Sequence, residues 1–175
     1  MTIQIIQEQQ KHFAEISNVI QQAFLAEEIS NHQEQYVVQK LRASDAYMPS
    51  LSLVALDGEK VIGHMMLSKV HIVEGEQRVP SLALAPLSVH PNYQRQGIGT
   101  RLMHEALKRA KELPYEFIIV LGHPDYYQRF GFQKASDWHI KAPFPVPDEA
   151  FMALPLTPNA RQHVRGTVHY STAFL

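Results

Sequence analysis

The chain has 175 residues, 45% of them hydrophobic and 19% charged, and its net charge is −1 when histidine is neutral. This length and composition predict one globular domain over residues 1–175. The balanced charge argues against a nucleic-acid-binding or anionic-membrane surface, so we expect neither partner. The absence of cysteine excludes disulfides, thiolate metal sites and a cysteine nucleophile. No apolar run approaches the roughly 18–20 residues of a membrane span and no signal-peptide pattern is present, so we expect a cytoplasmic protein.

In the first half of the chain, hydrophobic periodicity predicts two helices and several antiparallel strands. Apolar residues recur at helical spacing over 9–24 and again over 32–42. Two apolar runs flank the turn Asp57-Gly58, which is a typical β-hairpin signal. The expected strands lie at 3–6, 52–56, 61–67 and 82–89.

The second half predicts a βαβ unit followed by shorter elements. An amphipathic helix over 98–110 connects the strand at 82–89 to the continuous apolar run at 117–121, so these two strands should run parallel. The remaining expected elements are a short helix at 125–130, a strand from Phe132, a proline-rich loop at 142–147 and strands at 151–154 and 164–170.

The loop at 94–100 joins the strand and the helix of that unit, and it contains Gly97 and Gly99. The first N–H groups of a helix have no partner inside the helix, and the helix dipole favours negative charge at this end. Glycines let a ligand approach the backbone closely. The loop therefore predicts an anion site of the kind that holds the pyrophosphate of a nucleotide-like cofactor.

Two motifs carry a resemblance to a known superfamily. Gln94-Arg95-Gln96-Gly97-Ile98-Gly99, between an apolar strand and a long helix, resembles the Gln/Arg-x-x-Gly-x-Gly/Ala signature of the GCN5-related N-acetyltransferases (GNAT). The segment at 127–132 resembles their Tyr-x-x-x-Gly-Phe segment. Further segments at 61–64, 84–89, 121–127 and 143–147 are similar to YhbS-like predicted N-acetyltransferases.

The resemblance implies an α/β (α+β) fold with a mixed, mostly antiparallel central sheet, a βαβ unit, splayed fourth and fifth strands and flanking helices. It implies acetyl-CoA as co-substrate. The backbone N–H groups of the loop would bind its pyrophosphate, and a strand edge would pair with its pantetheine. A bulge near Pro86 or Ser88 would open the slot for the thioester. The implied cofactor-binding residues are Leu87, Ser88, Val89, Arg95, Gln96, Gly97, Ile98, Gly99 and Thr100.

Acetyl transfer to an amine needs an oxyanion site, a proton for the leaving thiolate and an amine in its neutral form. The resemblance assigns the acid to Tyr127, whereas we expect Tyr126 to face elsewhere on its helix. Three residues are candidates for the general base and none is preferred decisively. Glu34 matches a Glu common in YhbS-like chains, His64 lies on a strand beside a glycine, and His123 follows the strand that borders the slot.

Ten histidines invite a metal hypothesis, but none shows helical ligand spacing with a partner carboxylate, so we expect no metal. The Rossmann and P-loop signatures are absent as well. Two functions therefore stay open. The first is direct acetyl transfer to a primary amine of a small molecule or peptide, and the second is a non-catalytic acyl-CoA-binding sensor. We expect Glu27, Glu28 and Glu34 to give the site a mildly acidic mouth, which would favour a cationic amine. Homodimers are common in the superfamily, although no sequence feature here indicates one.

Overall fold

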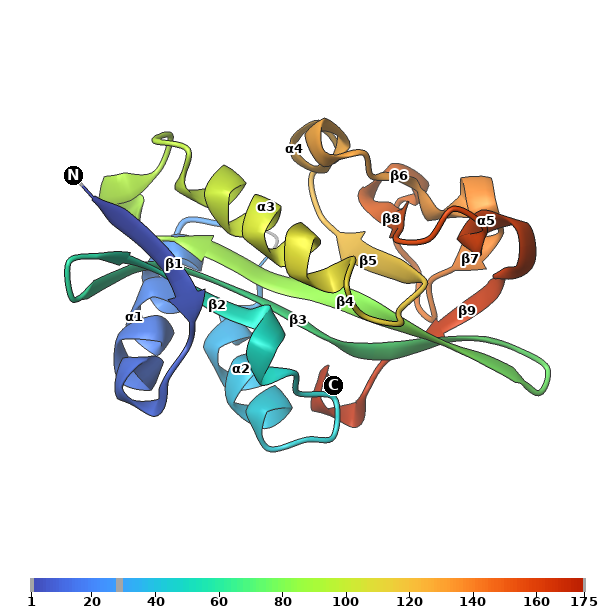
Figure 1. Cartoon of the computed structure of the whole chain (residues 1–175), viewed down its shortest axis with the longest axis horizontal. Helices are drawn as coiled ribbons and strands as arrows, with labels where there is room; N and C mark the ends of the chain where they lie inside the picture. Colours follow the sequence, from blue (N-terminus) through green and yellow to red (C-terminus); the bar gives the residue numbers. More distant parts are fainter. Residues whose placement is uncertain (1, 28–29, 175) are drawn as a thin grey trace.

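One large mixed sheet runs the length of the molecule (Figure 1). The computed structural model describes residues 2–27 and 30–174. The strands are β1 Ile3–Gln7, β2 Ser52–Asp57, β3 Lys60–Glu74, β4 Gln77–Val89, β5 Phe117–Leu121, β6 Gln133–Lys134, β7 Ile140–Lys141, β8 Phe151–Pro155 and β9 Gly166–His169. Their order is β1-β2-β3-β4-β5-β8-β6, and β9 pairs with both β3 and β7. Only β4–β5 and β7–β9 are parallel among the pairings of the described residues.

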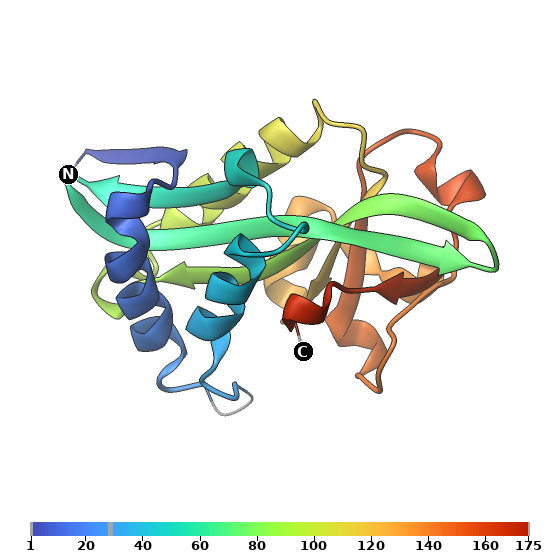
Figure 2. The same cartoon turned by 90° about the horizontal axis from the view of Figure 1, so that it is seen from below.

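The helices cover both faces of this sheet. They are α1 Phe13–Phe24, α2 Glu34–Arg42, α3 Ile98–Ala110, α4 Pro124–Tyr127 and α5 Ala160–His163. Short 3-10 turns lie at Gln10–His12, Pro49–Leu51, Pro91–Tyr93, Gln128–Phe130, Ala135–Trp138, Asp148–Ala150 and Thr172–Phe174. α3 packs on one face, whereas α1 and α2 lie side by side on the other, where the turn at Thr172–Phe174 lies beside α2 (Figures 1 and 2).

Strand alternation explains these layers. Leu53 and Ala55 of β2 pack in the core under α3, whereas their neighbours Val54 and Leu56 pack against α1 and α2. Successive side chains of a strand point to opposite faces, so an apolar run that alternates in this way fills two cores at once. A third cluster, around Trp138, fills the far end of the sheet under β9.

The expected βαβ unit is confirmed. α3 begins after Gly97, whose φ of 80° is left-handed, and its buried residues recur at helical spacing from Ile98 to Ala110. β4 and β5 are parallel, but only over three pairs, of which the last is Leu84 with Val120. Beyond that pair the two strands part. The mostly antiparallel sheet with splayed fourth and fifth strands confirms the fold class.

The expected bulge in β4 is present at the point of separation. β3 pairs Met65 with Leu87 and then Leu67 with Leu84, so β4 carries one extra residue between these pairs. The β3–β4 hairpin itself is longer than the expected strands at 61–67 and 82–89. Its outer part is held by β9, which pairs Ile72 with Val168. That support comes from the end of the chain, so local periodicity could not indicate it.

Candidate active site

A groove of about 1090 Å³ opens where β4 leaves β5. Its lining comes from the end of α1, the start of α2, β4 from Leu84 to Val89, the loop at 93–100, the end of β5 with α4, and the segment at 146–150. Pockets that bind drug-sized ligands measure roughly 300–1,000 Å³, so this groove has room for a large ligand. The groove gathers most of the residues that the sequence indicated.

One edge of β4 faces the groove beyond its last pair with β5. The N–H of His90 bonds to the carbonyl of Ile62 at 2.8 Å, so the backbone of His90, and by alternation that of Ser88, faces β3. The backbone groups of Leu87 and Val89 then point the other way, toward the gap, and both residues line the groove. Ser88 is buried opposite His64 and does not line it. Of the three predicted strand residues, two therefore reach the groove.

The glycine loop forms one end of the groove. Arg95 and Gly97 both have left-handed backbones, with φ of 63° and 80°. This geometry turns the loop into the first turn of α3, whose N–H groups have no partners within the helix. The predicted residues that line the groove here are Arg95, Gly97, Ile98, Gly99 and Thr100. Gln96 does not line it, and its amide nitrogen lies 3.4 Å from the carbonyl of Asn92. The loop is thus shaped to bind an anion.

The Tyr127 ring is held firmly at the end of β5. A Cβ on Gly122 would lie 2.6 Å from Cε2 of Tyr127, so the ring rests directly on this glycine. Phe132 contacts it edge-on with ring centroids 5.8 Å apart. Within residues 2–27 and 30–174, no group hydrogen bonds to the Tyr127 hydroxyl, and burial raises the pKa of this phenol. A neutral, fixed hydroxyl in the groove can donate a proton.

Tyr126 also lines the groove, which corrects the expectation that it faces elsewhere. α4 has only one turn, and both of its tyrosines reach the same side. The hydroxyl of Tyr126 approaches Gly99 across the groove, and Arg129 stacks on its ring at 4.5 Å. Burial raises the pKa of Tyr126, and Arg129 opposes that shift. In the sequence, Gly99, the second glycine of the loop, is the signal that could have indicated the contact with Tyr126.

Two of the three candidate bases reach the groove. Glu34 lies at the start of α2, where its Oε2 accepts a 2.5 Å hydrogen bond from Ser30, and its buried Oε1 has no hydrogen-bond partner among the described residues. His123 is exposed at the start of α4. Glu27 also lines the groove, whereas Glu28, the third acidic residue expected at the mouth, lies outside the described residues. Glu149, from the loop before β8, adds a carboxylate that sequence reasoning missed.

His64 lies elsewhere, in a fully buried position under α1 and α2. Its Nε2 is 3.1 Å from a carboxylate oxygen of Glu8 and 3.2 Å from the hydroxyl of Ser52. Burial lowers the pKa of His64, although the neighbouring Glu8 carboxylate opposes this shift. The structure does not bring this histidine into the groove, because its strand position points to the opposite face from Met65 and the α3 core.

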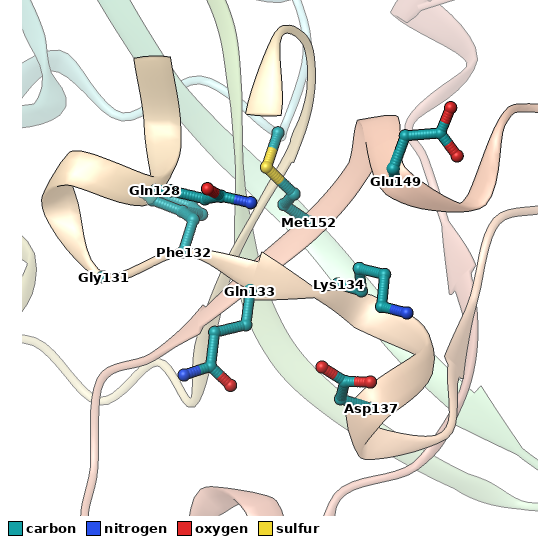
Figure 3. A pocket seen from close by; sticks show the side chains of 8 residues that line it. All are labelled: Gln128, Gly131, Phe132, Gln133, Lys134, Asp137, Glu149 and Met152. Atoms are coloured by element: carbon teal, nitrogen blue, oxygen red, sulfur yellow. The ribbon is translucent and has the colours of Figure 1, made fainter. Parts of the chain in front are cut away.

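A second, smaller hollow of about 410 Å³ lies beside β6 (Figure 3). Phe132 and Met152 form its apolar part, with Lys134, Asp137 and Glu149 around it. It contains none of the predicted site residues. In the part of the chain that the structure describes, no group of three or more His, Asp or Glu side chains could hold a metal ion. No helix among these residues is long and apolar enough to cross a membrane.

Comparison with known families gives the groove a context. A family model described as an acetyltransferase (GNAT) domain matches residues 4–135, which include the glycine loop, the splayed strands and Tyr127. The chain belongs to the GNAT acetyltransferases. The GNAT match confirms the resemblance inferred from the two motifs.

Two curated GNAT relatives come from Escherichia coli K12. The uncharacterized N-acetyltransferase YhbS is 34% identical over 153 residues, which cover 87% of this chain and 89% of YhbS. The uncharacterized N-acetyltransferase YjhQ is 36% identical over 115 residues, which cover 65% of this chain and 63% of YjhQ.

Two solved GNAT structures share the whole fold. A Brucella melitensis GNAT acetyltransferase in complex with acetyl-CoA superposes with a TM-score of 0.82 at 32% identity, covering 99% of each chain. Escherichia coli YhbS in complex with CoA superposes with a TM-score of 0.86 at 28% identity, covering 99% of this chain and 91% of YhbS. The relatives thus include an acetyl-CoA complex and a CoA complex.

Proposed function

We propose that residues 1–175 form one acetyltransferase domain that transfers the acetyl group of acetyl-CoA directly to a primary amine of a small molecule or peptide. The observation that carries this proposal is the parting of β4 and β5 after Leu84, between the α3 N-terminus and Tyr127. The two relatives that hold acetyl-CoA and CoA share this fold.

In this proposal, acetyl-CoA lies along the groove. The N–H groups from Arg95 to Thr100 bind the pyrophosphate, because a helix N-terminus stabilises negative charge. The groove-facing backbone groups of Leu87 and Val89 pair with the amides of pantetheine, as a neighbouring strand would. The carbonyl of Val89 accepts a hydrogen bond from the Gln94 side chain, so we expect Gln94 to move when the cofactor binds.

The chemical step needs donors at the thioester. The N–H of Val89 or Leu87 stabilises the oxyanion that forms when the amine attacks the carbonyl carbon. The C–S bond then breaks, and Tyr127 gives its proton to the CoA thiolate. The attacking amine loses a proton to Glu34, His123 or water. Carboxylates of Glu34 and Glu149 beside the groove favour an acceptor with positive charge.

A screen of amines, peptides and cell metabolites for acetyl-CoA-dependent mass gain tests this function, with free CoA release as the second readout. We expect acetylation of at least one cationic amine. Binding of CoA without acetylation of any compound would overturn the proposal and favour the non-catalytic sensor. Glu34→Gln and His123→Asn, assayed on the acceptor that the screen identifies, then separate the two candidate bases.

The loop has its own test. Gly97→Glu places a negative charge where the pyrophosphate would lie, so we expect calorimetry to detect no CoA binding. Gly97→Asn is the matched control, because asparagine tolerates the left-handed backbone and adds no charge. Native CoA affinity in the Glu variant would refute the assignment of this loop.

A further inference from the structure

The buried carboxylate of Glu8 is the meeting point of four parts of the chain. Arg42, at the end of α2, donates Nε–H to Oε2 and Nη2–H to Oε1, both at 2.9 Å. The hydroxyl of Tyr47 donates to Oε2 at 2.6 Å, and His64 of β3 lies 3.1 Å from Oε1. The side chains of Glu8 and His64 are fully buried and that of Arg42 is 10% exposed. We call these four residues the Glu8 cluster.

The protonation states in the Glu8 cluster fix its geometry. Burial alone would raise the pKa of Glu8, but the bonds from Arg42, His64 and Tyr47 outweigh it and hold that pKa far below its usual range. Burial lowers the pKa of His64, which favours its neutral form, and Nε2 of His64 must donate because an ionised carboxylate only accepts hydrogen bonds. The Glu8 anion thus faces the Arg42 cation and the donors of Tyr47 and His64. Both oxygens of Glu8 are engaged, which leaves the carboxylate a single orientation.

The same arginine reaches α1. The Arg42 guanidinium stacks on the ring of Phe13 at 3.7 Å, and Phe13 is the first residue of α1. Arg42 is the last residue of α2. The opposite ends of these two helices, Phe24 and Glu34, line the groove. The Glu8 cluster therefore fixes both helices at the ends that lie away from the groove.

We infer that Glu8 and Arg42 are positioning residues for the wall of the groove that α1 and α2 form, and thereby for Glu34. This inference rests on the proposed function, because it concerns the acceptor end of that site. α2 is also packed by apolar side chains such as Val38 and Leu41, whose contacts are not directional, and Ser30 donates a hydrogen bond to Glu34 at its first residue. Its nine residues span about 12 Å, so a tilt of about 5° at Arg42 would displace Glu34 by about 1 Å.

The first variant removes the bidentate contact between Arg42 and Glu8. Arg42→Lys keeps the positive charge but replaces the planar fork with a single ammonium group. We expect acceptor kcat/KM to fall about 10-fold to 100-fold, the range that a displacement of this size produces. Affinity for CoA, measured by calorimetry, should change less than about 2-fold. The glycine loop leads into α3, which packs on the opposite face of the sheet from the Glu8 cluster. Amide exchange at Tyr36 and Val37, in the first turn of α2, should become faster.

A double variant separates positioning from stability. Glu8→Gln with Arg42→Met removes both charges, and the amide of the new residue can still bond to Tyr47 and His64. We expect a melting temperature near that of the native chain, since replacing a buried ion pair by uncharged groups is often neutral. The acceptor kcat/KM and the amide exchange rates in α2 should nevertheless resemble those of the Arg42→Lys variant.

Two matched controls complete the test. Arg109→Lys makes the same change at the half-exposed pair with Glu105 on α3, and Val168→Ala lowers stability in the separate core under β9. Neither should alter the acceptor kinetics. Native-like kinetics and exchange in both cluster variants, or an equal kinetic loss in Val168→Ala, would overturn the inference. If the native chain binds CoA and acetylates no amine, the proposed function fails, and exchange in α2 alone decides this inference.

Discussion

The hydroxyl oxygen of Tyr126 lies 2.6 Å from the point where a Cβ atom on residue 99 would stand. Real Cβ atoms do not approach other heavy atoms so closely, so Tyr126 can take this position only because residue 99 is glycine. The contact joins α4 to the first turn of α3 across the groove. Residues far apart in the chain thus meet where we propose that the pyrophosphate binds.

Gly99→Ala should displace the Tyr126 ring without destabilising the fold. Alanine favours the helix, and the group that must move is the far end of a side chain. We expect an unchanged or slightly higher melting temperature and a CoA affinity that is weaker by about 10-fold, or roughly 1.4 kcal/mol. Calorimetry and thermal unfolding measure the two effects.

Tyr126→Phe is the control for that change, because it removes only the oxygen that would collide. The next ring atom, Cζ, lies 3.8 Å from the same point, which is an ordinary contact distance. The double variant should therefore bind CoA as tightly as Tyr126→Phe alone. If adding Gly99→Ala to Tyr126→Phe weakened CoA binding further, the collision between the Tyr126 hydroxyl and the alanine Cβ would not be the cause of the lower affinity.

Tyr127→Phe should slow acetyl transfer and leave CoA binding intact. A general acid contributes about 10²-fold to 10⁴-fold to the rate, and phenylalanine preserves the contacts with Gly122 and Phe132. Because burial raises the pKa of Tyr127, its hydroxyl keeps its proton above pH 10, so it should impose no alkaline loss of kcat below that pH. Pre-steady-state CoA release in native and variant proteins measures the step. A native rate in the variant would exclude Tyr127 as the acid.

Acidification should destabilise the protein through the Glu8 cluster, in two stages. Burial lowers the native pKa of His64 below the unfolded value of about 6.5, so the unfolded chain takes up this proton first and stability falls as the pH drops through that value. Glu8 has a depressed native pKa, so its contribution is present above the unfolded pKa of 4.5 and is lost as the pH falls further. Urea unfolding between pH 8 and pH 2 follows both stages. His64→Gln should remove the first stage, and an unchanged profile in that variant would contradict this assignment.

Gly166→Ala should be strongly destabilising, because a Cβ there would lie 2.2 Å from the backbone oxygen of Val73. β9 could not stay paired with β3, and together with the unfavourable φ we expect a loss of about 3 kcal/mol in the free energy of unfolding. Gly75→Ala is the matched control. Its φ is also positive, but no atom of the described residues lies within 4 Å of the added Cβ, so about 1 kcal/mol should be lost. Equal losses would mean that backbone strain alone matters.

The sequence predicted those parts of the fold and the site that depend on neighbouring residues. The βαβ unit and the glycine loop follow from continuous patterns between residues 82 and 121, whereas the bulge was implied by the resemblance to the GNAT family. The structure confirms the unit and the bulge. The insertion of β8 between β5 and β6 could not be predicted, because it pairs residues such as Ile119 and Ala153 that lie far apart in the chain.

The Glu8 cluster shows why part of the site escaped prediction. Residues 8, 42, 47 and 64 share no spacing, and their meeting depends on how β1, α2 and β3 pack together. His64 was a candidate base because the sequence did not show toward which face of the sheet its side chain points. Tyr126 escaped for another reason, since α4 is a single turn and a helical periodicity is not defined over four residues.

Among the described residues, the parting of β4 and β5 also leaves the groove-facing edges of the two strands without a neighbouring strand beyond Leu84 and Val120. Unpaired strand edges are templates on which a second chain can add a strand, and proteins usually protect them. If pantetheine pairs with Leu87 and Val89, the cofactor is also the group that covers this edge. Saturation with CoA would then slow self-association on storage, and a shortage of CoA would lower the lifetime of the protein as well as its turnover.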